Sequence, residues 1–242
     1  MRPGLSLIGA GYLWGVLGMG LLCPASLGAQ VDSSQGPAPV FIGGEALSDW
    51  AMAQLDISRA AAPGRSRTLQ DRLEEVRAMY FLSVDEGDWV DRGKDSLAVL
   101  RDQVPPGSVV EPVVQAYRGA LEVVRAKHSR WPPNKLKYLN RGAEILDELV
   151  AEHPENLEIR YLRLASYRFL PFFLSRDDAV ADDLQVLVAK LPQEPEAFSP
   201  PIYRAVLRFV LENTALAEED QARFEDALNQ PLQGHGDANN GR

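Results

Sequence analysis

Residues 138–167 constrain the fold more than any other part of this chain. The first half of this stretch carries a stripe of large apolar residues at helical spacing, formed by Ile145, Leu146, Leu149 and Val150. Pro154 cannot continue a helix, and Asn156 is a favoured N-cap for the next one. The stretch therefore predicts an αα-hairpin, two antiparallel helices joined by a turn at residues 153–156.

The first half of this hairpin recurs along the chain. A small residue is followed by a large apolar residue four positions later, another three later, and a proline five later. The three copies are Gly93, Leu97, Leu100 and Pro105; Gly142, Leu146, Leu149 and Pro154; and Val180, Leu184, Leu187 and Pro192. This pattern is typical of the second helix of a tetratricopeptide (TPR) repeat, and residues 68–192 thereby resemble such repeats. The resemblance implies an all-α fold, with TPR-like αα-hairpin repeats forming a short right-handed solenoid or a compact helical bundle.

A narrower resemblance covers residues 116–174. Its marks include Tyr117, Gly119, Ala120, His128, Tyr138, Gly142, Pro154, Asn156, Arg160, Arg163 and Pro171. In these positions the chain resembles a family of secreted bacterial TPR-like proteins of uncharacterised function. After Pro171 the sequence FFLSRDD departs from that family. The resemblance implies a fold and a compartment, and it implies no reaction.

The N-terminal 29 residues have the three-part layout of a secretory signal peptide, with cleavage expected after Ala29. Two alternatives are an uncleaved membrane anchor and a lipoprotein attached through Cys23. Residues 30–44 are rich in Pro and Gly and predict a flexible linker. We expect a helical TPR-like domain at 45–229, a disordered tail at 230–242, and export to the periplasm or cell envelope.

The cysteine count and the net charge limit the kinds of site and partner that the chain can have. The chain has one cysteine, Cys23, so cleavage after Ala29 would leave no disulfide, cysteine nucleophile or thiolate metal site. The net charge is −9, and cleavage would remove one further basic residue. An acidic balance argues against nucleic acid as a partner, and no stable membrane span is expected after cleavage.

Helical periodicity predicts roughly nine helices and no strand. Besides the hairpin, the expected helices cover 45–61, 68–82, 88–103, 109–127, 177–190 and 200–213, and a last one begins at Thr214 or Ala215 and ends near Asn229. Thr68 and Asp71 predict a capping box, and Ser175 is expected to cap a helix. Residues 129–134 are expected to form a loop around Trp131.

Motifs of standard catalysis are missing. The histidines His128, His153 and His235 show no HExxH spacing, and the chain has no GxSxG elbow, Walker A loop or calcium-loop spacing. We therefore expect no catalytic, cofactor-binding or metal-binding residue, and no cofactor. Because catalytic groups can converge from distant positions, an enzyme stays an alternative.

One basic interval contrasts with the acidic background, because no Asp or Glu occurs between Glu122 and Glu144. The candidate partner-binding residues in and after it are His128, Trp131, Lys135, Lys137, Tyr138, Arg141, Arg160 and Arg163. Guanidinium groups suit carboxylates, and aromatic residues supply rigid anchors. The interval could bind an acidic peptide, a C-terminal carboxylate or an anionic envelope component. Alternatively Trp131 fills a helix junction and the arginines pair with internal acids.

The apolar run at 167–174 also has two interpretations. It could be a surface that docks a partner or a membrane, or a buried corner between helices, which the adjoining apolar stripe favours.

The sequence thus favours a non-catalytic protein–protein interaction scaffold of the cell envelope. Its expected partner is another envelope protein or an acidic or extended peptide. The alternatives are an envelope enzyme or enzyme subunit with an unrecognised site, and a self-assembling structural component.

Overall fold

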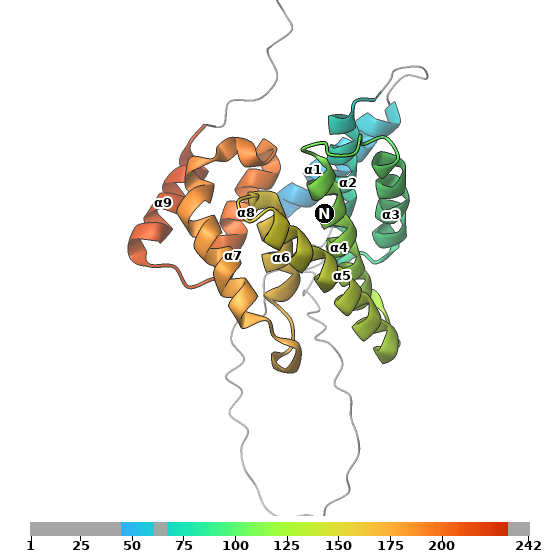
Figure 1. Cartoon of the computed structure of the whole chain (residues 1–242). Coiled ribbons are helices and arrows are strands. Elements are labelled where there is room, and N and C mark those ends of the chain that lie inside the picture. The colour runs from blue at the N-terminus through green and yellow to red at the C-terminus, as the bar shows by residue number, and fades with distance from the viewer. Residues whose placement is uncertain (1–44, 61–66, 232–242) are drawn as a thin grey trace, which may run out of the picture. The chain divides into compact units, whose positions relative to one another are not determined.

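A computed structural model describes residues 45–60 and 67–231 (Figure 1). This part contains nine α-helices and three short 3-10 helices, and no strand. The α-helices are α1 (Glu45–Ala60), α2 (Leu69–Asp85), α3 (Asp88–Arg101), α4 (Glu111–His128), α5 (Pro132–Glu152), α6 (Leu157–Tyr167), α7 (Asp177–Lys190), α8 (Pro200–Asn213) and α9 (Glu218–Asn229). The prediction of an all-α fold is confirmed. The predicted signal peptide and linker, and nearly all of the predicted tail, lie outside the described residues.

Local capping chemistry sets two helix starts as predicted. The Thr68 hydroxyl accepts a hydrogen bond from the Asp71 amide at 3.1 Å, and the Asp71 carboxylate accepts one from the Thr68 amide at 2.9 Å. The Asn156 side chain accepts hydrogen bonds from the amides of Glu158 and Ile159. Each cap satisfies amide groups that have no partner inside the helix.

Two other predicted helix starts and one predicted cap were wrong. Helix α5 begins at Pro132, inside the expected loop, because proline suits the first turn of a helix, where no amide donor is needed. Helix α7 has Arg176 at its N-cap and no side-chain cap, so Ser175 does not cap it. Helix α9 begins at Glu218, where consecutive acids favour the positive end of the helix dipole.

Consecutive helices pack as hairpins. Helix α2 contacts α3, α4 contacts α5, and α6 contacts α7, while α4 also contacts α2 and α6. The three copies of the recurring sequence pattern begin at Gly93 on α3, Gly142 on α5 and Val180 on α7. The repeated pattern therefore falls on alternate helices, α3, α5 and α7.

Helices α4 and α5 approach each other at a pair of glycines. A Cβ atom added at Gly142 would lie 2.5 Å from the Gly119 carbonyl oxygen and 2.7 Å from Val123 Cγ2. A Cβ atom added at Gly119 would lie 3.0 Å from the Gly142 carbonyl oxygen. The backbones thus touch at this crossing, which requires residues without a side chain.

We expect Gly142→Ala to lower the free energy of unfolding by about 1–2 kcal/mol. Overpacking typically costs about 1–3 kcal/mol, and the better helix propensity of alanine returns up to about 1 kcal/mol. Urea unfolding followed by circular dichroism measures the change. Gly93→Ala is the matched control, because its Cβ atom would meet only side-chain atoms at 3.4 Å or more. That variant should be neutral or slightly stabilising, and equal losses in both would contradict the crossing.

The C-terminal helices pack back onto the earlier ones. Helix α8 contacts α1, and the Tyr161 ring of α6 lies edge-to-face against Phe198 and Phe209, with centroids 6.1 and 5.7 Å apart. The Ser199 hydroxyl donates to the Glu74 carboxylate of α2 at 3.2 Å. The segment from Phe198 through α8 therefore closes the core over α6 and α1.

The favoured interpretation of the apolar run as a buried corner was only partly right. Tyr167 is buried, and the Phe169 ring packs edge-to-face on Phe209. Phe172 and Phe173, however, are 91% and 65% exposed, with their ring centroids 5.6 Å apart. The 3-10 helix at Phe172–Leu174 turns these two rings outward, away from the apolar stripe that leads up to them.

Candidate functional site

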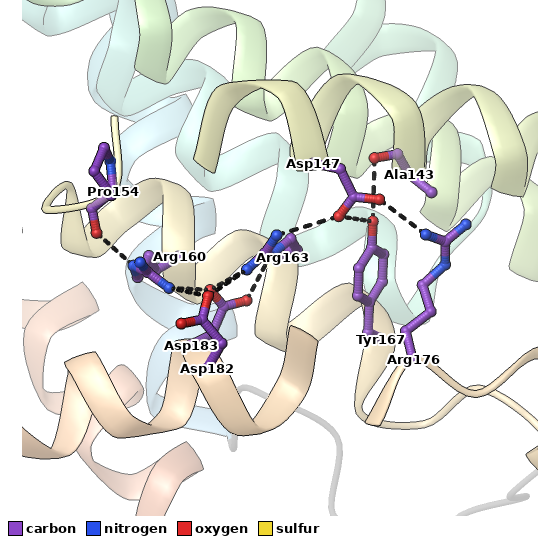
Figure 2. A network of polar contacts seen from close by, with 9 residues as sticks. All are labelled: Ala143, Asp147, Pro154, Arg160, Arg163, Tyr167, Arg176, Asp182 and Asp183. Atoms are coloured by element: carbon purple, nitrogen blue, oxygen red, sulfur yellow. Dashed lines mark hydrogen bonds and ion pairs between the residues drawn. The ribbon is translucent and has the colours of Figure 1, made fainter. Parts of the chain in front are cut away.

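Two of the predicted site residues lie inside an ion-pair network. Arg160 Nη1 is 2.7 Å from Asp182 Oδ2 and 2.9 Å from Asp183 Oδ1. Arg163 Nε is 2.8 Å from Asp183 Oδ2, and its Nη2 lies 2.8 Å from Asp183 Oδ1. Figure 2 shows both guanidinium groups pointing from α6 at the carboxylates of α7. This arrangement matches the interpretation in which the arginines pair with internal acids.

Asp147 of α5 extends the network in the opposite direction (Figure 2). Its carboxylate lies 3.3 Å from Arg163 Nη1 and 2.8 Å from Arg176 Nη1, and it accepts a hydrogen bond of 3.0 Å from the Tyr167 hydroxyl. The same hydroxyl lies 3.1 Å from the Ala143 carbonyl oxygen. Polar contacts therefore tie α5, α6 and α7 together.

The two aspartates of α7 differ in burial and hence in pKa. A hydrogen bond from Arg160 lowers the pKa of Asp182, which is largely exposed. Burial raises the pKa of Asp183, and its contacts with Arg163 and Arg160 oppose that rise. Asp183 is thus a carboxylate removed from water, and the two guanidinium groups compensate its charge.

A second buried network joins α2, α4 and α6. Arg77 donates through Nε and Nη2 to the Glu158 carboxylate, at 2.8 and 2.5 Å, and the Tyr117 hydroxyl donates to Glu158 at 2.7 Å. Burial lowers the pKa of Arg77, but the Glu158 carboxylate outweighs this and leaves it raised. Burial also raises the pKa of Tyr117. Arg77, Tyr117 and Glu158 therefore satisfy one another's hydrogen-bonding groups inside the core.

Other predicted residues share an outward stripe of α5. Trp131, Tyr138 and Arg141 follow one another at about the helical period, and Trp131 is 64% exposed. The guanidinium of Arg125 on α4 lies over the Tyr138 ring, 4.5 Å from its centroid. We call Arg125, Trp131, Tyr138 and Arg141 the α4–α5 stripe. It offers an exposed indole at the N-terminal end of α5 and a cation stacked on a tyrosine ring further along, a combination that suits protein recognition.

The remaining candidates lie around this stripe. Lys137 is exposed, and Lys135 is half-buried. His128 turns away toward α2, where its Nε2 lies 2.8 Å from the Ser83 carbonyl oxygen. The structure thus places Trp131, Tyr138 and Arg141 along one side of α5, and it places His128, Arg160 and Arg163 in internal contacts.

Arg141 also belongs to a cluster of arginines that the sequence did not single out. Burial and the neighbouring guanidinium groups of Arg101 and Arg141 lower the pKa of Arg118. Within residues 45–60 and 67–231, none of these three side chains forms a hydrogen bond or an ion pair. Three like charges from α3, α4 and α5 therefore lie close together, and the nearby carboxylates of Glu122 and Glu148 offset part of their repulsion at Arg118.

Arg101 and Arg118 precede Glu122, where the acid-free interval begins, so the search for cations within that interval missed them. A local signal was nevertheless present, because Arg118 and Arg141 each directly precede one of the glycines of the α4–α5 crossing. A close glycine crossing brings the preceding residues of both helices near each other.

Residues 45–60 and 67–231 hold no group of three or more His, Cys, Asp or Glu side chains placed to bind a metal ion. In the same ranges, no helix is both long and apolar enough to cross a bilayer.

Comparison of the chain with protein-family models, curated proteins and solved structures finds no match. The class that its described part defines is that of all-helical proteins.

Proposed function

We propose that this protein is a non-catalytic interaction scaffold of the cell envelope, built from TPR-like helical hairpins. The contact pattern supports the repeat assignment, because α2, α4 and α6 each pair with the following helix, and α4 contacts both α2 and α6. Stacked repeats require such neighbour contacts. The signal-like layout of residues 1–29 supports export.

The exposure of Trp131 on the α4–α5 stripe is the observation that carries this proposal. An indole is a costly group to leave in water, and tryptophan and arginine are the residues most enriched among binding hot spots. Tyr138 under Arg125, with Arg141 beyond, continues the same surface. A partner with an acidic or extended segment suits this combination of aromatic and cationic groups.

We expect Trp131→Ala to weaken retention of an envelope partner at least tenfold, since loss of a hot-spot residue costs about 2 kcal/mol or more. The measurement is affinity capture from envelope extracts, quantified by titration, after circular dichroism has shown unchanged helix content. Phe173→Ala is the matched control, because it removes a similarly exposed aromatic ring, 65% against 64%, from another surface. Equal retention by wild type and Trp131→Ala would contradict the proposal.

The exposed Phe172–Phe173 pair favours a second candidate, a self-assembling structural component. Adjacent phenylalanine rings in water favour association of identical surfaces. In that case the apparent mass from light scattering should rise with protein concentration. The double variant Phe172→Ser/Phe173→Ser should abolish the rise, and a concentration-independent mass in the wild type would exclude this candidate.

A further inference from the structure

An open groove of about 500 Å³ runs between α7 and α9. One face of α7 forms one wall, and the loop before α9 with the first half of that helix forms the other. Most of the lining consists of small or medium apolar side chains, among them Ala181, Leu184, Val188 and Ala189 on α7 and Leu216 and Ala217 on the opposite wall. The alanines are exposed, so their small side chains leave the groove open to solvent.

The two helices run in the same direction along this groove. Arg223 Nη2 of α9 donates a hydrogen bond to the Val188 carbonyl oxygen of α7 at 2.6 Å. Figure 1 shows α7 and α9 side by side, with their first turns toward the same end. Both walls therefore begin at the same end of the groove, and Arg223 links them further along.

The end at which both walls begin is acidic. The first turns of α7 and α9 carry four exposed acids between them, Asp177, Asp178, Glu218 and Glu219. Each pair lies within about one helical turn of an alanine that lines the groove. The four carboxylates favour a cationic group on whatever binds at that end.

Neighbouring arginines do not cancel this charge. Arg176, next to Asp177, lies 2.8 Å from the Asp147 carboxylate, and Arg223 pairs with Asp220 in the wall of the groove. Arg168 donates to the carbonyl oxygen of the last residue of α8. A single guanidinium group cannot offset four carboxylates, so this end keeps its negative charge.

The walls favour a helix over an extended segment. The backbone groups of α7 and α9 are engaged within their own helices, so the walls offer no row of N–H and C=O groups. An extended peptide on this apolar lining would lose water from its backbone without gaining hydrogen bonds. A helix satisfies its own backbone, and its apolar residues at helical spacing pack into a groove between two helices. The α7 wall covers residues 181–189, about 12 Å, which two to three turns of a helix match.

Two other classes of ligand fit this groove less well. A small molecule typically buries most of its surface in its pocket, and an open groove does not provide that. A bilayer surface is approached by protruding apolar side chains, whereas here the apolar residues line a hollow, and the acids would be repelled by anionic lipids.

We propose that the α7–α9 groove binds an amphipathic helix of a partner protein, with alanine to leucine on its apolar face and lysine or arginine at one end. The apolar face packs against the groove, and the basic residues meet the acids of the first turns of α7 and α9. This surface is separate from the α4–α5 stripe and selects the opposite charge, so the inference goes beyond the proposed function.

Fluorescence anisotropy of the full chain with a labelled peptide tests the inference. The probe is a helix of about four turns, long enough to be partly helical in water, with leucine and alanine on one face, glutamine on the other and lysines in its last turn. A second peptide has glutamate in place of lysine, and a third has a proline in the middle, which breaks the helix. We expect the lysine peptide to bind, more weakly as salt rises, and the other two to bind at least tenfold more weakly.

A variant of the apolar lining assigns the binding to this groove. Ala181→Gln places a long polar side chain in the groove and should weaken the lysine peptide at least tenfold. Ala98→Gln is the matched control, because it makes the same change at an exposed alanine of α3, outside the groove, and should leave the affinity unchanged.

A second variant tests the acidic end without altering the apolar lining. Glu218→Gln/Glu219→Gln should weaken the lysine peptide about fivefold at low salt, because two opposing charges are lost. Asp88→Asn/Asp91→Asn removes two exposed acids from the first turn of α3 and should change nothing. Circular dichroism checks that each variant folds.

The inference is overturned if the lysine peptide does not bind, if the glutamate or proline peptide binds as tightly, or if Ala181→Gln binds like the wild type. Sedimentation with phosphatidylglycerol vesicles that Ala181→Gln abolishes would make the groove a lipid surface instead. A mass in light scattering that rises with concentration in the wild type and not in Ala181→Gln would make its occupant a second copy.

The Trp131→Ala variant separates this inference from the proposed function, because Trp131 lies on the α4–α5 stripe and its loss should not affect the lysine peptide. If the peptide fails while Trp131-dependent capture holds, only this inference falls. If the peptide binds while capture does not depend on Trp131, the surface assigned under the proposed function falls instead.

Discussion

Replacing Glu158 with alanine should destabilise the protein by about 3–5 kcal/mol, because the variant leaves Arg77 as a buried charge without its main partner. The Tyr117 hydroxyl also loses its acceptor inside the core. Urea unfolding at neutral pH measures the loss of free energy of unfolding. An unchanged dependence of that free energy on urea concentration serves as a check on two-state behaviour. Glu152→Ala, an exposed carboxylate near the end of α5, is the control and should change stability by less than about 0.5 kcal/mol.

A compensated variant separates burial of a charge from loss of packing. Arg77→Met/Tyr117→Phe/Glu158→Leu removes every polar group of the network and keeps similar volumes. Buried ion pairs replaced by apolar residues are often neutral or more stable, so this variant should recover most of the loss. A triple variant as unstable as Glu158→Ala would mean that packing, and not the unpaired charge, caused the effect.

Asp183→Ala should cost about 3–5 kcal/mol, because Arg160 and Arg163 are buried and, among their carboxylate partners in the described residues, Asp183 alone is fully buried. The neighbouring Asp182→Ala is the matched control. Asp182 contacts the same two arginines, but its side chain is 55% exposed, so water screens its charge and the cost should stay below about 1 kcal/mol.

A double-mutant cycle tests whether Asp183 acts through the arginine. Asp183→Ala, Arg163→Met and the double variant are compared by urea unfolding. We expect the coupling between the two positions to exceed about 1 kcal/mol, because the side chains share two hydrogen bonds. Additive losses would mean that the two residues stabilise the fold independently.

The sequence predicted those features that depend on neighbouring residues. Thr68 with Asp71, and Pro154 with Asn156, act over three or four positions, and the structure has both caps where they were expected. The start of α5 was missed because proline is compatible both with a loop and with a first helical turn. Trp131 could be placed at a junction, but its exposure could not be predicted, since exposure depends on what packs nearby.

Features that depend on tertiary placement could not be predicted from the sequence. Arg77 and Glu158 are 81 residues apart in the chain, and Arg160 reaches Asp183 across 23 residues. The sequence left open whether Arg160 and Arg163 bind a partner or pair with internal acids, because the position of α7 decides which carboxylates they meet. The Arg101–Arg118–Arg141 cluster likewise exists only because three helices meet.

The contact between α8 and α1 has a consequence for how the molecule unfolds and folds. In an open row of repeats, the terminal pair can separate while the others stay intact. Here α1 packs against α8. Glu74 on α2 accepts a hydrogen bond from Ser199, which lies 125 residues further along the chain. Loss of either end therefore opens the same core, so the helices should melt in one transition. During synthesis from the N-terminus, α1 and α2 can form their contacts with α8 and Ser199 only after most of the described part has been made. Such contacts between distant parts of the sequence slow folding.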